Sequence, residues 1–185
     1  MNAIELLMQE HQLILGALDA LDAFVAAQSR GGDDRAELAR FVHFIRAFAD
    51  TRHHAKEEDI LFVAMVAAGF PRDGGPIAVM LMDHDAGRAH VAAMAERAEQ
   101  SAPWSDEDRR AMAAACGGYA DLLRGHIQKE DRILYPMAVQ RLPEEAMRRV
   151  DRDCAAFEAR QVAAGGDALK VLAGELAARH LPARS

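Results

Sequence analysis

A short phrase that occurs twice constrains this chain more than any other feature of its sequence. The two copies are His53-His-Ala-Lys-Glu57-Glu-Asp-Ile-Leu-Phe62 and His126-Ile-Gln-Lys-Glu130-Asp-Arg-Ile-Leu-Tyr135. Residues i and i+4 of an α-helix lie about 40° apart around the axis and one turn apart along it. The first histidine and the glutamate of each copy can therefore reach one point beside a helix, as a metal-binding pair must. Because the copies also share a lysine, an acidic residue and an Ile-Leu-aromatic ending, the phrase predicts two helices that bind metal.

Apolar residues at helical spacing predict four long helices. They run from about residue 4 to 28, from 35 to 68, from 76 to 100 and from 105 to 139, and segments with glycine, proline or serine separate them. Pro136 lies within the last turns of the fourth helix, where we expect it to kink or end the helix. The apolar residues are mostly good helix formers, so we expect an all-α fold. Short connections favour an up-down-up-down four-helix bundle.

Length and charge narrow the class of protein further. The 185 residues suit one domain, with residues 1–142 as the bundle and residues 143–185 as a short helical appendage packed on it. The net charge of −7 comes from mixed acidic and basic residues, so neither a nucleic-acid partner nor a membrane partner is expected. No signal peptide or membrane span is apparent. Cys116 and Cys154 form no metal or redox motif. We therefore expect a cytoplasmic protein with two free thiols.

One histidine stands near the middle of each expected helix, and these residues are His11, His53, His84 and His126. In antiparallel neighbours they lie at nearly the same depth, because each is roughly 17 to 21 residues from the connection that joins its pair of helices. At about 100° per residue, His11 and His84 share stripes with apolar residues and face the core. A single histidine there would be an ordinary hydrogen-bonded core residue. Four in one layer predict a metal site.

The glutamates of the two copies strengthen this interpretation. Buried Glu57 and Glu130 need charge partners to stay ionised in an apolar layer. Arg46 and Arg88 are the only basic residues that we expect to face inward, so metal cations would have to supply the missing charge. The same helical arithmetic places Ile133 on the inner face of the fourth helix.

The first copy contains a second His-x-x-x-Glu pair, His54 and Glu58. Aligning the Ile-Leu-aromatic endings matches His53 with His126 and leaves His54 without a counterpart. On the helical wheel, His54 and Glu58 also lie on the more polar side of the helix. We therefore predict His53 and Glu57 as ligands. His54 and Glu58 are the less favoured candidates, with His54 as an extra ligand or a group beside the site.

At these residues the chain resembles the hemerythrin-like family, whose members carry an HHE cation-binding domain. The resemblance covers about residues 4–140. It implies a non-haem di-iron site inside the bundle, oxo- or hydroxo-bridged, with Glu57 and Glu130 bridging two iron ions. The terminal ligands that it implies are His11, His53, His84 and His126. Mixed imidazole and carboxylate ligands suit iron among the available metals.

One position departs from the oxygen-carrying hemerythrins, which have a second histidine one turn after the first on the third helix. Arg88 occupies that position here. A site with fewer histidines leaves exchangeable positions on the metals, which favours reaction or sensing over oxygen carriage. Arg88 and Tyr119, which stands two turns before His126, are candidates for roles beside the metals without binding them.

These observations lead to two functional hypotheses. The first is a soluble di-iron protein that binds or reacts with a small oxidant (O2, peroxide or nitric oxide), as an oxidoreductase that removes peroxide or in the response to oxidative or nitrosative stress. The second is a non-catalytic iron or redox sensor that signals through metal-dependent conformation. A ferritin-type oxidase fits less well, because that class uses Glu-x-x-His pairs.

Overall fold

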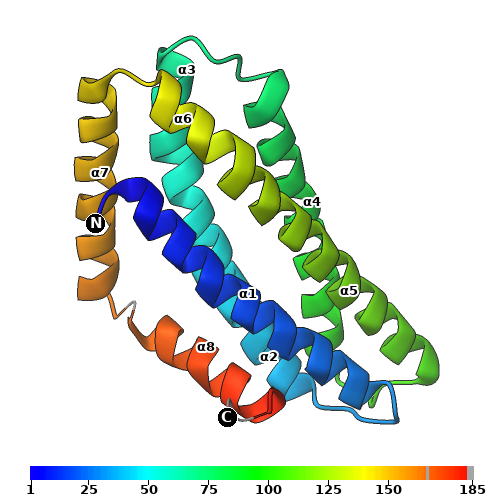
Figure 1. Ribbon diagram of the computed structural model, residues 1–185. Coiled ribbons are helices and arrows are strands. Elements are labelled where there is room, and N and C mark those ends of the chain that lie inside the picture. Colours follow the sequence, from blue (N-terminus) through cyan, green and yellow to red (C-terminus); the bar gives the residue numbers. More distant parts are fainter. Residues whose placement is uncertain (166, 183–185) are drawn as a thin grey trace.

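The computed structural model describes residues 1–165 and 167–182 of the chain (Figure 1). Within these ranges every regular element is a helix. Four long helical segments lie side by side in Figure 1. The first and third segments are single helices, α1 (Ala3–Gln28) and α4 (Gly75–Ala98). The chain is therefore all-helical, as its sequence predicts.

The second and fourth segments are continuous helices that change type along their length. The second consists of α2 (Arg35–Phe44), η1 (Ile45–His54), η2 (Glu57–Leu61) and α3 (Phe62–Ala67). The fourth consists of α5 (Asp106–Lys129), η3 (Glu130–Leu134) and α6 (Tyr135–Arg141). The η elements are π-helical, with backbone hydrogen bonds to the fifth preceding residue instead of the fourth. The first copy of the repeated phrase lies mostly on η1 and η2, and the second runs from the last turn of α5 through η3. Such π-helical turns are uncommon in proteins.

The ends of the long segments follow from local sequence. The side chain of Asn2 accepts a hydrogen bond from the backbone N–H of Glu5, and Ser105 does the same for Asp108, so α1 and α5 begin with capping boxes. Gly69 has a φ of 95° just after α3, a conformation that side chains other than glycine rarely adopt. These signals place the segment boundaries within a few residues of those predicted.

Pro136 does not end the fourth segment, which continues beyond it to Arg141. Pro136 lies in the first turn of α6, directly after the π-helical turn η3. A proline is tolerated at the start of a helix, where its missing N–H needs no partner. The change of helix type therefore lets the segment pass through the proline.

A polar layer divides the apolar core into two clusters. His11 lies between Leu7 of the smaller cluster and Ile14 of the larger, and His84 lies between Met80 and Val91 in the same way. The second and fourth segments repeat this order around the repeated phrases. Buried polar groups in such a layer are shielded from water on both sides, which strengthens their electrostatic interactions.

Two further helices, α7 (Glu144–Ala163) and α8 (Asp167–His180), follow the fourth segment. Helix α7 contacts α1, η2 and α3, and α8 contacts α1 and α2. The Nε2 atom of His180 lies 2.9 Å from Oε1 of Glu37 and helps to hold α8 in place. The predicted appendage, 143–185, includes residues 166 and 183–185, which lie outside the described residues. Across the described ranges, no helix combines the length and apolar character needed to cross a bilayer.

Candidate metal centre

The π-helical turns decide which side chains of the repeated phrase face inward. A π-helical turn holds more residues than an α-helical turn, so successive side chains rotate less around the axis than an α-helical wheel assumes. As a result both His53 and His54 are buried. Ile133, expected on the inner face, is instead 52% exposed. The inward position predicted for Ile133 came from applying α-helical geometry to a π-helical turn. The low rank of His54 came from the alignment of the two phrases, which left it without a counterpart, and from the same α-helical geometry.

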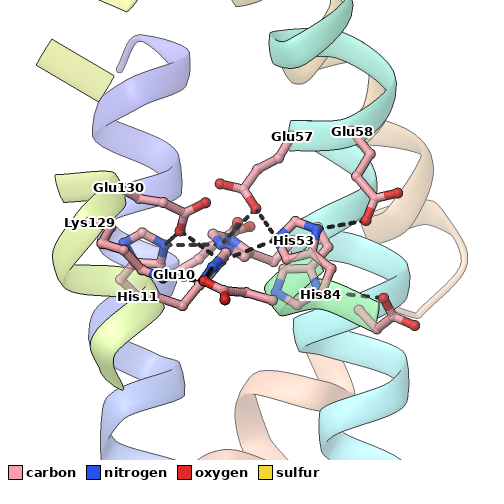
Figure 2. Close-up of polar contacts among 12 residues, drawn as sticks. Glu10, His11, His53, Glu57, Glu58, His84, Lys129 and Glu130 are labelled. Atoms are coloured by element: carbon pink, nitrogen blue, oxygen red, sulfur yellow. Dashed lines mark hydrogen bonds and ion pairs between the residues drawn. The ribbon is translucent and has the colours of Figure 1, made fainter. Parts of the chain in front are cut away.

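Two groups of buried residues bring potential ligand atoms together. Within each group, one ligand atom per residue lies within 4.8 Å of all the others. The first, which we call the His11 group, comprises His11, His53, Glu57 and Glu130. The second, the His84 group, comprises His54, Glu57, His84 and His126. All six favoured ligands and His54 thus converge, and Glu57 is common to both groups. Figure 2 shows the labelled imidazoles and carboxylates meeting between the helices.

Each glutamate of the repeated phrase has a carboxylate oxygen near histidines of both groups. The Oε2 atom of Glu57 is 3.7 Å from Nε2 of His53 and 3.6 Å from Nε2 of His84. The Oε2 atom of Glu130 is 3.2 Å from Nε2 of both His11 and His126. Each carboxylate therefore lies beside one histidine of the His11 group and one histidine of the His84 group. This arrangement is suited to contacting two cations at once.

Several polar atoms at this centre have no hydrogen bond within the described part of the chain. They are Oε2 of Glu57, both carboxylate oxygens of Glu130 and Nε2 of His54. Nearly all buried polar atoms in proteins are hydrogen-bonded, because leaving one unpaired is costly. A cation held by these atoms would satisfy them all, so the residues present fit a metal site.

The histidines are oriented by carboxylates on the side away from the centre. In each case Nδ1 lies near a carboxylate oxygen, and an ionised carboxylate can only accept, so Nδ1 donates. The distances are 2.8 Å for His11–Asp131, 2.9 Å for His53–Glu10, 3.4 Å for His54–Asp50, 2.7 Å for His84–Glu58 and 3.3 Å for His126–Asp83. An imidazole that donates from Nδ1 can offer Nε2 to a metal once Nε2 has no proton, as in many metal sites. In this structure Nε2 of His11 lies 3.0 Å from Nε2 of His53, and Nε2 of His84 lies 3.1 Å from Nε2 of His126, so the ligand atoms of each pair already face each other.

The repeated lysine and the acidic residue after each glutamate now have a structural explanation. Lys56 pairs with Glu10, the partner of His53, and Lys129 pairs with Asp83, the partner of His126. Glu58 and Asp131, which follow the two glutamates, accept the Nδ1 hydrogen bonds of His84 and His11. Each copy of the phrase thus supplies potential ligands together with support for histidines on neighbouring helices. Glu58, a less favoured ligand, has this supporting position and belongs to neither group.

The expectation about inward basic residues was wrong. Arg52 and Lys56 are both fully buried, and they pair with Glu10 and Glu158 instead of Glu57 and Glu130. Neither Glu10 nor Glu158 is among the residues predicted from the sequence. Glu158 lies on α7, more than a hundred residues from Arg52 in sequence, so no local pattern indicates the contact.

The two residues that were expected beside the metals differ in their surroundings. Arg88 is 40% exposed and bridges Asp50 and Glu58, each at 2.7 Å, so it contacts carboxylates that orient His54 and His84. Tyr119 is buried and lines a cavity next to the His84 group.

Tyr135, which the sequence shows only as the aromatic end of the second phrase, has a direct contact instead. Its hydroxyl donates a 2.5 Å hydrogen bond to Oε1 of Glu57. Its ring also stacks on His11, with 5.6 Å between the ring centroids. The same hydroxyl lies 3.4 Å from Nε2 of His11. Tyr135 thereby fixes Oε1 of Glu57, while Oε2 faces His53 and His84.

Burial and close charges displace the pKa values at this centre. Burial raises the pKa of Glu57 well above its usual range, and the charge of Glu130 adds to the shift. Burial also acts to raise the pKa of Glu130, but His126 and His11 outweigh it and hold that pKa well below the usual value. Burial acts to lower the pKa of His11, yet the carboxylates of Asp131 and Glu130 raise it to about 9. In the metal-free protein at pH 7, His11 therefore carries a proton, and the raised pKa of Glu57 favours its neutral form.

We expect the affinity for a divalent cation to rise with pH from about pH 6 to pH 9. The raised pKa values of His11 and Glu57 mean that both groups must lose a proton before binding, so low pH opposes binding. Each released proton makes the affinity change by up to about tenfold per pH unit. Chelator competition with Co(II) across this range measures the slope, and a pH indicator counts the released protons. An affinity independent of pH would contradict these protonation states.

A cavity of about 90 Å³ adjoins the His84 group. Its walls include three imidazoles of that group, His54, His84 and His126, together with Tyr119, Gly87 and Leu122. One water molecule takes up about 30 Å³ in the liquid. The cavity therefore has room for a molecule of two or three non-hydrogen atoms beside the histidines.

Comparison with known families gives one match. The profile of the family described as "Hemerythrin HHE cation binding domain" matches residues 2–138. This range contains every residue of the His11 and His84 groups and ends before α7. No curated protein matches the chain.

Proposed function

The chain belongs to the hemerythrin HHE cation-binding domain family, and from that premise we propose that it is a di-iron protein that binds or reacts with a small oxidant. That it is a metal-binding protein follows from the family and from the His11 and His84 groups. The proposal extends this to two iron ions, one at each group. The observation that carries it is the pair of buried ligand groups that share Glu57, with a small cavity beside one of them.

The proposal includes the finer architecture of the fold. We infer an up-down-up-down four-helix bundle over residues 1–142, with residues 143–185 as an extension packed on it. In this arrangement the repeated phrases on the second and fourth segments face each other across the layer. His11 and His84, on the first and third segments, complete the two groups.

The ligand chemistry supports iron. Each group combines imidazole nitrogens with carboxylate oxygens, a mixture that suits iron, and neither group contains a cysteine. When bound, the two iron ions would supply electrons and open coordination positions for a small oxidant. The chain's own residues orient the ligands through the Nδ1 hydrogen bonds and direct Oε2 of Glu57 toward the histidines through Tyr135. The apolar clusters on both sides exclude water.

The cavity has room for a small ligand. Its volume suits O2, peroxide or nitric oxide, each of which has two non-hydrogen atoms. Because the three imidazoles of the His84 group line its wall, we propose that the ligand reaches the metal of this group. The physiological roles that we propose for such a protein are the removal of peroxide or a part in the response to oxidative or nitrosative stress.

Filling the cavity tests this route. A Cβ atom at Gly87 would lie 3.5 Å from the ring of Tyr119 and 3.9 Å from Leu122, which are ordinary contacts, so a leucine at this position extends into the cavity. We expect Gly87→Leu to keep its iron but to react with nitric oxide or peroxide at least about tenfold more slowly. Stopped-flow absorbance measures the rate. Gly125→Leu, at an exposed position on α5 with no neighbour within 4 Å, is the matched control. An unchanged rate in iron-loaded Gly87→Leu would rule out this route.

The function itself is tested by loading the protein with Fe(II) without oxygen and then adding O2, peroxide or nitric oxide separately. Absorption spectra and turnover are recorded for each. Sustained consumption of peroxide supports an enzyme, whereas a reversible oxygenated spectrum supports a carrier. If none of the three oxidants changes the spectrum of the iron-loaded protein, the proposal fails.

A redox or iron sensor is the second candidate, and one observation favours it. Helix α7 contacts the support of the centre directly, because Oε1 of Glu158 lies 2.6 Å from Nζ of Lys56. A change at the metals therefore has a physical route to the C-terminal helices. Single-turnover oxidation accompanied by a large change in protease cleavage within α7 would support the sensor over the enzyme.

A further inference from the structure

The two halves of the centre match in sequence but differ in what covers them. Lys56 and Lys129 occupy the same position in the two copies of the phrase, and each pairs with a carboxylate that orients a histidine. Lys56 is fully buried, whereas the side chain of Lys129 is 38% exposed. The difference arises from α7, which covers the half that contains Lys56.

Glu158 is the residue of α7 that reaches this half. Its Oε1 accepts hydrogen bonds from Nζ of Lys56 at 2.6 Å and from Nε of Arg52 at 3.1 Å, and its Oε2 pairs with Nη2 of Arg52. Arg52 also lies 4.0 Å from Oε1 of Glu10. The four side chains form a neutral set of two cations and two carboxylates. Both cations are fully buried, so removing either carboxylate would leave buried positive charge less well compensated.

Glu10 connects this set to a candidate metal ligand. Its Oε1 pairs with Lys56, while its Oε2 accepts a 2.9 Å hydrogen bond from Nδ1 of His53. The direction of the His53 ring thus depends on where the carboxylate of Glu10 is held. That carboxylate is held by Lys56, which Glu158 holds in turn.

We propose that Glu158 is a positioning residue for the metal centre, acting through Lys56 and Glu10 to aim Nε2 of His53 at the cation of the His11 group. Without Glu158, Lys56 would lose one of its two carboxylate partners and draw more strongly on Glu10, whose carboxylate would turn away from His53. The His84 group has its own support, Lys129 and Asp83, and would be unaffected. The inference rests on the proposed two-metal site. Helix α7, which carries Glu158, lies outside residues 2–138, the range that the family profile matches. The proposed role of Glu158 therefore belongs to the helices that follow the matched domain.

The test is a titration of metal-free Glu158→Gln with Co(II), in competition with a chelator. We expect the affinity for one of the two equivalents to fall by about 10- to 100-fold, as when other groups that orient metal ligands are removed, and the other to stay unchanged. Asp83→Asn, at the corresponding support of His126, should weaken the other equivalent. Glu145→Gln is the control on the same helix, because its ion pairs are with Arg148, Arg149 and Arg152 of α7.

A second readout separates positioning from mere loosening of α7. The Nδ1 proton of His53 gives a shifted resonance in the cobalt-loaded protein, and it should exchange faster with solvent in Glu158→Gln than in the wild type. Val150→Ala weakens the packing of α7 without touching the charged set, because Val150 belongs to the apolar core. It should lower the thermal midpoint but leave both affinities and this proton unchanged. If Glu158→Gln does not fold, Glu158→Asp, which keeps the charge, replaces it with a smaller expected loss.

Each outcome decides between the proposals. If the wild type takes up two equivalents and the Glu158 variant matches it, the positioning role is wrong and the metal site stands. If Val150→Ala weakens the same equivalent as strongly, Glu158 acts only by stabilising α7 and the positioning role is also wrong. If the wild type itself takes up fewer than two equivalents, the proposed two-metal site is what fails.

Discussion

Glu57→Gln is expected to abolish binding of both metal ions while the protein stays folded. Glu57 is the residue common to both ligand groups, and its Oε2 faces His53 and His84. An amide oxygen carries no charge to balance two cations. We expect affinity to fall by more than the roughly 100-fold loss seen when groups that only orient ligands are removed. Iron content after anaerobic loading and gel filtration measures the effect.

The metal-free form of the same variant provides the internal check. Since burial raises the pKa of Glu57 and so favours its neutral carboxyl form, replacement by the isosteric amide should change the free energy of unfolding by less than about 1 kcal/mol. Glu96→Gln, at an exposed position of α4, is the control and should retain two irons. Two irons bound to Glu57→Gln would show that Glu57 does not bridge them.

Lys56→Met is expected to cause the largest loss of stability. Removing one member of a buried charged set leaves its partners uncompensated, which costs about 3–5 kcal/mol. Lys56 is fully buried and pairs with both Glu10 and Glu158. Urea denaturation of the metal-free protein measures the change.

The repeat in the sequence supplies the matched control for this variant. Lys129→Met removes the corresponding lysine, which is partly exposed and pairs with Asp83, so we expect a loss of about 1 kcal/mol or less. Equal losses of stability in the two variants would show that Lys56 and its charged partners are not buried in solution.

Much of the fold was predictable because its signals are local. Apolar spacing identified the four long helical segments, and segments with glycine, proline or serine marked their ends. The prediction that one histidine of each segment lies at the same depth needed only two assumptions. These were the rise per residue of a helix and antiparallel directions of neighbouring helices. The structure brings these histidines together with Glu57 and Glu130. Their binding of iron stays a prediction.

The remaining features depend on contacts that no local pattern shows. The inward turn of His54 and the outward turn of Ile133 follow from π-helical geometry, which an α-helical wheel cannot represent. The support of His53 by Glu10 crosses between two segments, and Glu158 comes from a helix beyond the bundle. The shared Lys-Glu-acid pattern did signal that these residues matter, but their partners became clear only in three dimensions.

The central claim is that two iron ions occupy this layer, one at each ligand group. Anomalous diffraction at the iron absorption edge, from crystals of the anaerobically loaded protein, tests it most directly. We predict two peaks, one beside Nε2 of His11 and His53 and one beside Nε2 of His54, His84 and His126, both within bonding distance of Glu57. A single peak, or peaks away from these side chains, would contradict the account.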